Sequence, residues 1–558
     1  MAENVLKFDV SAKTYKKLAD KRLDEDDLEG ALSLLLEAKG KTKYVLSIYF
    51  DIAEIYYEME LYDYSLKYWF RCLDRAPKYD YEDIYNGIGA CYYNLNNYTA
   101  ATYYFNQQFL VSKDGNMYLD DDIIDSVSKM MNPSEGFKVV YPPEEADYED
   151  VMRRAKTLMM RGDTEEACAL YLSVPEGAAE YENAQLEASV GEFLEGKSEQ
   201  AVARSRAIYE KDEKNVFALC NLASMYNYNG AEMLSGLYFS KIKEENAAND
   251  DELYKIATAC MEHKKYERAA ACFKTLLADR PYDMQLLFLY GISLYNGGDF
   301  AAAKEVFGRI LRITEVNPSA LSCYRRADRM LAGNVKNFRP LPDFVRPFDD
   351  EEEENTRRMA QLLKIRSDKA LKKEMRDKSF WDLVDWGFCA GDKEMARCAC
   401  YLLAICDTKK ADEYLLDKLL DPTLPDEMKA YICELLALKT FDKTVGIVVS
   451  NIYKKITFYP LYTDRGARGE IFASAYAACF ARCATTGDYD LRKIYDSAAD
   501  LYYGEDTYGK EYAGKELEAL IFLHSGAETV VSIEECALFF GCDEKKLRKL
   551  LEKTEKKL

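Results

Sequence analysis

The 558-residue sequence has little of what an enzyme or a metal site needs. It holds two histidines, His263 and His524, and no cysteine pair in the CxxC spacing that structural zinc sites use. The patterns of a phosphate-binding loop, a serine-hydrolase nucleophile elbow and a zinc-protease helix are absent as well. The sequence therefore predicts no catalytic residue, no metal site and no cofactor.

Long apolar runs are also missing. No stretch of 18 or more apolar residues occurs, and the opening residues MAENVLKFDV lack a basic segment followed by an apolar one. We therefore expect a cytoplasmic chain without a membrane span. The 16 cysteines agree with a reducing compartment, because several of them, such as Cys72 and Cys260, fall inside apolar helical segments.

Positive charge is in deficit. The chain has 97 Asp and Glu residues against 75 Lys and Arg residues, a formal net charge of -22. A field of this sign argues against broad binding of nucleic acids or anionic membranes. It favours a protein or peptide partner with basic segments.

What the sequence does contain is a repeated pattern of small and large residues. A small residue occurs eight times, with a step of 34 between most copies: Ala19, Ala53, Gly89, Ala155, Ser189, Ala223, Ala257 and Gly291. A second small residue follows twelve positions later: Ala31, Ser65, Ala101, Ala167, Ala201, Ser235, Ala269 and Ala303. Four positions further stands a large apolar residue: Leu35, Trp69, Phe105, Tyr171, Phe239, Phe273 and Phe307. Ser205 interrupts this rule in the fifth copy. The pattern predicts pairs of antiparallel helices that cross at the small residues.

The second copy carries a recognisable motif, with Tyr49, Ile52, Ala53, Tyr56, Ser65, Trp69, Cys72 and Pro77 in order. This spacing resembles the tetratricopeptide repeat (TPR), and the chain is similar to bacterial TPR proteins. The resemblance implies an all-α fold: a TPR-type α-solenoid of about eight helical hairpins, followed by a helical C-terminal region that is HEAT-like or degenerate-TPR-like. It also implies a non-enzymatic scaffold or adaptor that holds a partner.

Proline-rich and charged segments divide the pattern. We expect a first array of three repeats plus a capping helix at 1–131, a linker at 132–146, and a second array of five repeats plus a capping helix at 147–335. A proline-rich, acidic linker follows at 336–355, then helices at 356–528 and a helix-turn-helix-like hairpin at 529–558. No strand-like alternation of useful length is apparent.

The last hairpin suggests an alternative function. Ala537 stands four residues before Gly541 among apolar residues, a spacing that resembles helix-turn-helix domains that bind DNA. In this alternative the chain is a TPR-based regulator, and the possible DNA contacts are Lys545, Lys546, Arg548 and Lys549. Asp543 and Glu544 would repel phosphate near the start of the second helix, so packing or protein contact is the competing interpretation.

In TPR proteins the first helices of successive repeats line a concave groove. The resemblance places in that groove Phe50, Glu54, Tyr57, Asn86, Tyr93, Asn94, Met152, Lys156, Met159, Phe193, Phe217, Asn221, Asn227, Tyr254, Met261, Phe288 and Tyr295. Aromatic and Met side chains would bind a peptide by apolar contact, and Asn would fix its backbone. The alternative is that these residues belong to the solenoid core or contact the C-terminal half of the chain.

The carboxylate clamp of chaperone-binding TPR domains needs Lys and Asn in the first two repeats. Lys16 fits one of these places, but Asp20, Asp51 and Glu54 occupy others with the opposite charge. A peptide with an acidic C-terminus is therefore not the expected ligand of the first array.

Overall fold

The structure is a computed structural model. It describes residues 11–43, 45–111, 148–333, 338–341, 349–389, 393–406, 408–439, 441–504, 514–526 and 532–555. The chain divides into two compact units, unit 1 with Met1–Val127 and Pro347–Leu558, and unit 2 with Ser128–Arg346. The capping helix expected at the end of 1–131 and the linker expected at 132–146 lie outside the described residues, as do residues 336–337 and 342–348 of the linker expected at 336–355.

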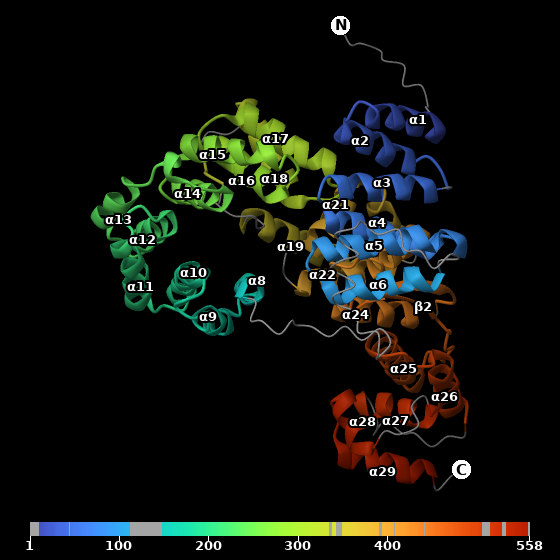
Figure 1. Cartoon of the computed structure of the whole chain (residues 1–558). Helices are drawn as coiled ribbons and strands as arrows, with labels where there is room; N and C mark the ends of the chain where they lie inside the picture. Colours follow the sequence, from blue (N-terminus) through green and yellow to red (C-terminus); the bar gives the residue numbers. More distant parts are fainter. Residues whose placement is uncertain are drawn as a thin grey trace. The chain divides into compact units, whose positions relative to one another are not determined.

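Unit 1 begins with three helical hairpins, which we call array one (Figure 1). Its helices are α1 (Ala12–Leu23), α2 (Leu28–Lys39), α3 (Leu46–Glu58), α4 (Tyr62–Arg75), α5 (Tyr81–Asn94) and α6 (Tyr98–Val111), with a 3-10 turn at Lys78–Asp80. The odd-numbered helices form the first-helix face of array one, and the even-numbered ones form its second-helix face.

Unit 2 holds five further hairpins, called array two, which follow one another round an arc (Figure 1). They are formed by α8 (Tyr148–Arg161), α9 (Thr164–Leu172), α10 (Tyr181–Leu194), α11 (Ser198–Lys211), α12 (Val216–Tyr228), α13 (Glu232–Phe239), α14 (Asp250–Glu262), α15 (Tyr266–Asp279), α16 (Met284–Asn296) and α17 (Phe300–Ile313). The 3-10 turn Glu244–Asn246 precedes α14, and α18 (Pro318–Leu331) packs on α17. Proline stands at the start of α18, where its missing N–H costs no hydrogen bond.

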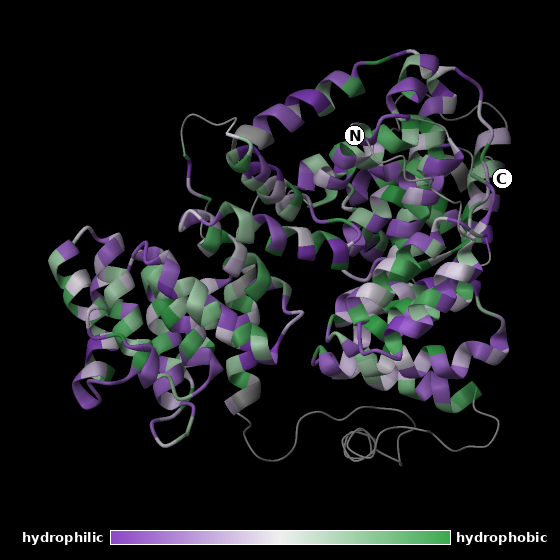
Figure 2. Ribbon diagram, turned by 90° about the horizontal axis from the view of Figure 1, so that it is seen from above, coloured by the Kyte–Doolittle hydropathy of each residue, from purple (hydrophilic) through white to green (hydrophobic). Residues whose placement is uncertain are grey.

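The predicted small and large positions are the core of both arrays. All eight small residues of the first helices and all eight of the second helices are buried. The seven large residues that follow are buried as well, and hydrophobic residues concentrate between the helices (Figure 2). A Cβ atom added at Gly291 would lie 2.7 Å from the Phe307 ring, so this helix crossing requires glycine.

Each of the eight hairpins turns through one residue with positive φ between its two helices. These residues are Asp26, Glu60, Asn96, Gly162, Gly196, Gly230, Lys264 and Gly298. Four of them are not glycine, and such residues adopt the left-handed region at a cost. The turn geometry is thus retained even where the sequence offers no glycine to signal it.

The C-terminal part of unit 1 is helical with one exception. Its elements are α19 (Asp349–Leu363), α20 (Asp368–Glu374), α21 (Lys378–Cys389), α22 (Lys393–Cys406), α23 (Lys409–Leu419), α24 (Asp426–Leu438), β1 (Thr444–Val449), β2 (Ile452–Thr457), α25 (Ala467–Thr486), α26 (Leu491–Tyr503), α27 (Lys515–Ser525), α28 (Ile533–Phe540) and α29 (Glu544–Glu555). One continuous apolar core runs through this region, from Met359 to Leu550.

The exception is the antiparallel hairpin β1–β2, so the expectation that no strand occurs was wrong. Thr444 pairs with Thr457 and Val449 with Ile452, leaving a two-residue turn at Ser450–Asn451. Both turn residues have positive φ, at 49° and 66°, as the tight turns preferred by hairpins require. Each strand has only six residues, too few for alternation to stand out from a buried helix segment.

Array one and the C-terminal part of unit 1 are joined by a polar interface. Arg71 on α4 makes two hydrogen bonds to Asp417 on α23, at 2.7 and 2.6 Å. One turn earlier, Lys67 lies 3.3 Å from Asp421. The Tyr104 hydroxyl on α6 donates to the Asn451 carbonyl in the hairpin turn at 2.8 Å. The second-helix face of array one is therefore occupied by the chain itself.

Candidate partner-binding surfaces

The first-helix face of array one carries a cluster of carboxylates. Asp20 on α1, Glu54 and Glu58 on α3, and Asp83 on α5 are exposed. Asp51 is half-buried, and the Lys16 amine lies 2.6 Å from it. The surface is therefore acidic and contains an ion pair.

The crowding of these carboxylates affects their protonation. Partial desolvation raises the pKa of Glu54, and the charges of Asp51, Glu58 and Asp83 raise it further, against the opposing effect of Lys16. A like charge nearby disfavours the ionised form of a carboxyl group. A cation brought to this surface would relieve that repulsion.

Aromatic and amide side chains flank the carboxylates. Phe50 meets the edge of Trp69 with ring centroids 5.2 Å apart. Asn94 donates one hydrogen bond to the Tyr57 hydroxyl at 3.0 Å. All six residues predicted for this groove keep some exposed surface: Phe50, Glu54, Tyr57, Asn86, Tyr93 and Asn94.

In array two the predicted residues divide into two groups. Seven are exposed or half-buried on the first helices: Met152, Lys156, Met159, Phe193, Phe217, Asn227 and Tyr254. Four are buried, with 1 to 4% of their surface exposed: Asn221, Met261, Phe288 and Tyr295. These four residues pack inside the solenoid and are not available to a partner, which corrects the prediction for them.

Contacts at the end of array two show why Tyr295 is buried. Tyr295 packs against Phe300 and also against Phe338, with ring centroids 5.1 and 5.8 Å apart. Asn296 exchanges two hydrogen bonds with the backbone of Leu341, at 2.9 and 2.7 Å. Residues 338–341 thus cover the helix surface that a repeat pattern alone leaves open. The sequence did not predict this role of Asn296, because a repeat pattern gives no information on contacts from outside the repeats.

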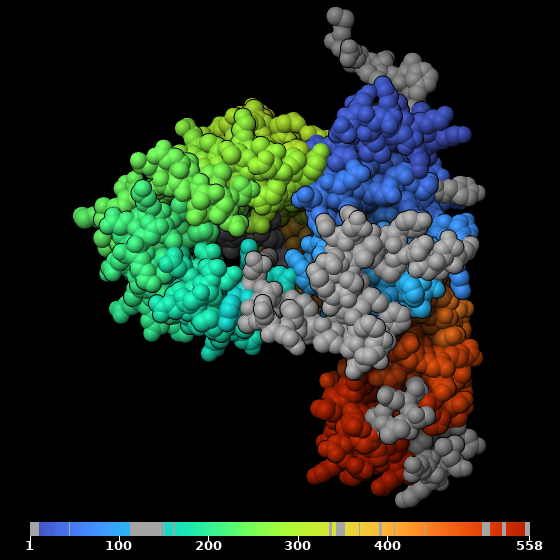
Figure 3. All heavy atoms as spheres, in the orientation of Figure 1, coloured from blue at the N-terminus to red at the C-terminus, as the bar shows by residue number. Residues whose placement is uncertain are grey.

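The C-terminal helices α27, α28 and α29 pack on one another and appear in red in Figure 3. A capping box at Ser532 and Glu535 begins α28, and Gly541 ends it with a φ of 62°. Of the four possible DNA contacts, Arg548 pairs with Glu544 at 2.6 Å and Lys546 lies 3.9 Å from Glu516. Lys545 and Lys549 are exposed. Carboxylates of the same small bundle therefore neutralise part of its positive charge.

Within the described residues no group of three or more His, Cys, Asp or Glu side chains is arranged to hold a metal ion. None of the helices among those residues has the length and apolar character needed to cross a membrane.

Comparisons with known proteins agree with this architecture. Residues 254–318 match the family model of the tetratricopeptide repeat. No curated protein sequence matches the chain.

Several solved structures are similar, with low identity and low TM-scores. A tetratricopeptide repeat protein from Parabacteroides merdae is 13% identical, with a TM-score of 0.23 over 54% of this chain and 98% of that one. Yeast Tom70 is 11% identical, with a TM-score of 0.25 over 77% and 89%. Human IFIT1, as a dimer with PPP-AAAA, is 14% identical, with a TM-score of 0.27 over 75% and 92%. Residues 254–318 thus belong to the tetratricopeptide repeat family, and the eight hairpins, whose small residues keep one register, give the chain an all-α, tetratricopeptide-type solenoid fold.

Proposed function

We propose that this protein is a non-enzymatic adaptor whose first-helix face of array one binds a basic segment of a protein partner. Tetratricopeptide folds generally mediate protein–protein interactions, and such interactions use the surface that the fold leaves free. One observation carries the proposal. The second-helix face is occupied by α23 and the β1–β2 hairpin, whereas the first-helix face keeps its carboxylates exposed.

The chemistry of this face supports a basic and partly apolar ligand. The exposed carboxylates of Glu54 and Asp83 attract Lys or Arg side chains, and the overall charge of -22 steers such segments toward the protein. The half-buried rings of Phe50 and Tyr93 offer apolar contact beside the charges. The half-exposed residues of array two, such as Phe193 and Tyr254, form a second proposed binding surface in unit 2.

The experiment is a direct binding measurement with the full-length protein and two synthetic peptides of equal length. One alternates Lys or Arg with Leu, and the other has Glu in place of each basic residue. The double variant Glu54→Gln, Asp83→Asn removes two charges from the first-helix face. Glu37→Gln, an exposed residue of α2, is the matched control.

We expect the basic peptide to bind more tightly than the acidic one, and more weakly as salt rises. The double variant should lower its affinity about three- to tenfold, as the loss of partly screened ion pairs predicts, while Glu37→Gln leaves it unchanged. Equal affinity for both peptides, or equal losses in both variants, would contradict the proposal.

A second candidate function is DNA binding by α28 and α29, favoured by the left-handed Gly541 turn and the exposed Lys545 and Lys549. Duplex DNA binding would be followed by fluorescence anisotropy over a range of salt concentrations. Salt-dependent binding that Lys545→Glu with Lys549→Glu abolishes supports this candidate. Binding that is absent at physiological salt in the unaltered protein removes it.

We also propose that the protein works in the reducing environment of the cytoplasm. The burial of 13 of its 16 cysteines, such as Cys72 and Cys260, supports this.

A further inference from the structure

The fifth repeat, α10 with α11, differs from the others in its interior. Three positions that hold large apolar side chains in the sixth repeat, at Leu219, Tyr226 and Phe239, are polar here. The corresponding residues of the fifth repeat are Gln185, Glu192 and Ser205. All three are nevertheless buried. A solenoid interior without its large side chains must either collapse or keep open space.

A hydrogen-bonded network holds this interior in place. Arg204 on α11 donates two hydrogen bonds to the Glu192 carboxylate on α10, at 3.0 and 2.7 Å. A further nitrogen of Arg204 donates to the Gln185 side-chain oxygen. Deeper in the hairpin, the Ser189 and Ser205 hydroxyls lie 2.8 Å apart. Glu192 is buried and Arg204 is half-buried, and the bidentate geometry of their ion pair fixes both side chains, so the walls around it are pre-organised.

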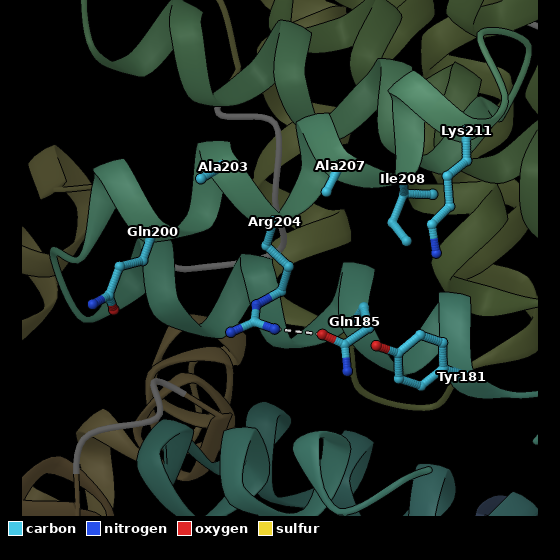
Figure 4. A pocket seen from close by; sticks show the side chains of 8 residues that line it. All are labelled: Tyr181, Gln185, Gln200, Ala203, Arg204, Ala207, Ile208 and Lys211. Carbon is cyan, nitrogen blue, oxygen red and sulfur yellow. Dashed lines mark hydrogen bonds between the residues drawn. The ribbon is translucent and has the colours of Figure 1, made fainter. Parts of the chain in front are cut away.

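Beside this network lies an open pocket of about 490 Å³. The side chains that line it come from α10 and α11 alone: Tyr181, Gln185, Gln200, Ala203, Arg204, Ala207, Ile208 and Lys211. In Figure 4, Lys211 and Tyr181 stand at one end of the pocket on opposite helices, and Arg204 with Gln185 lies farther along. A volume of this size falls within the range of small-molecule sites, roughly 300–1,000 Å³.

The charge of the lining is unusual for this chain. Its charged side chains are Arg204 and Lys211, and it includes no carboxylate. Glu192 neutralises Arg204, which leaves the Lys211 amine as the net charge of the pocket, in a protein with a net charge of -22. The remaining polar groups are the Tyr181 hydroxyl and the amides of Gln185 and Gln200, which can all donate hydrogen bonds.

The rest of the pocket lining is apolar. Ala203 and Ala207 are one helical turn apart on α11, and Ile208 and the Tyr181 ring stand nearby. We propose that this pocket binds a small organic carboxylate, with its short aliphatic body against the alanines and its carboxylate at Lys211 and Tyr181. This site lies in unit 2 and is separate from the peptide surface proposed on array one.

The test uses the full-length protein and two probes of equal chain length, hexanoate and hexan-1-ol, followed by ligand-observed NMR. Lys211→Met removes the charge and keeps the aliphatic stem. Ala207→Leu fills the pocket from an exposed helix position, so the fold is expected to tolerate it. Lys214→Met, at an exposed lysine that does not line the pocket, is the matched control. Circular dichroism verifies that all variants keep their helical content.

We expect hexanoate to bind at least about tenfold more tightly than hexan-1-ol. Lys211→Met should weaken hexanoate about fivefold or more, Ala207→Leu should abolish its binding, and Lys214→Met should change nothing. The proposal is overturned if the acid and the alcohol bind equally. It is also overturned if hexanoate binding survives Ala207→Leu, or if the protein binds neither probe.

Discussion

The interface between array one and the C-terminal part of unit 1 makes the sharpest prediction. Arg71 and Asp417 are separated by 346 residues in sequence and are joined by two hydrogen bonds. Arg71 also stacks on the Tyr68 ring, 4.5 Å from its centroid. Truncating Arg71 alone therefore removes the ring contact as well as the ion pair, and a double-mutant cycle with Arg71→Met and Asp417→Asn is needed to isolate the ion pair.

The expected coupling energy follows from the pKa of the Asp417 carboxyl group. Desolvation acts to raise the pKa of Asp417, but the charge and hydrogen bonds of Arg71, together with the charges of Lys418 and Lys39, outweigh it and hold the pKa at about 2, against an ordinary value of 3.8. A difference of about 1.8 corresponds to at most about 2.4 kcal/mol. Because 41% of the Asp417 side chain is exposed, solvent screening reduces this, and we expect a coupling energy of about 1–1.5 kcal/mol.

Tryptophan fluorescence during urea unfolding is the appropriate assay, because Trp69, Trp381 and Trp386 are the three tryptophans of the chain and all belong to unit 1. The control cycle is Arg492→Met with Asp496→Asn, a pair with side chains 56 and 51% exposed. Its coupling energy should stay at or below about 0.5 kcal/mol.

The stabilisation that Asp417 contributes changes with pH in a definite direction. The pKa of Asp417 is depressed in the folded protein, so its stabilising effect is complete above about pH 5 and is lost progressively as the pH falls toward 2. A coupling energy no larger than that of the control pair at pH 7 would refute our view that this contact fixes the C-terminal region to array one.

Two further predictions concern packing and thiols. Gly291→Ala should lower the free energy of unfolding by about 1–3 kcal/mol, because its Cβ would lie 2.7 Å from the Phe307 ring. Gly308→Ala, whose Cβ would find its nearest atom at 3.4 Å, should instead stabilise α17 by up to about 1 kcal/mol; equal effects by circular dichroism would contradict this packing. Thirteen of the 16 cysteines are buried, and Cys389 is the exposed one. Burial raises the pKa of thiols such as Cys220 to about 12, so a chromogenic disulfide reagent at pH 8 should titrate at most about three thiols quickly and all of them in denaturant.

Much of the fold was predictable because the repeat is a local pattern. The positions of Ala53, Ser65 and Trp69 depend on contacts within one hairpin, and every copy of the pattern is buried as expected. Ser205 marked the fifth repeat as irregular, and the structure places a polar network and a pocket there. The sequence did not reveal the pocket itself, because its shape depends on where Gln185 and Arg204 meet.

The predicted groove residues differ in exposure between the two arrays. Those near Glu54 keep exposed surface, because both the helical spacing and the exposure follow from one helix pair. Phe288 and Tyr295 stand at equivalent positions but are buried. For Tyr295 the covering group is Phe338, which lies beyond the last repeat and has no fixed place in the repeat pattern.

The sequence by itself determined the repeat class, the helix pairs and the acidic character of the first-helix face, because these depend on residues fewer than about 40 positions apart. Only the tertiary structure decided which face of array one the described C-terminal part of unit 1 covers. That outcome depends on Arg71 meeting Asp417 and Tyr104 meeting Asn451, pairs separated by 346 and 347 residues. A repeat pattern encodes the contacts of each hairpin with its neighbours, whereas these contacts form only after both parts have folded.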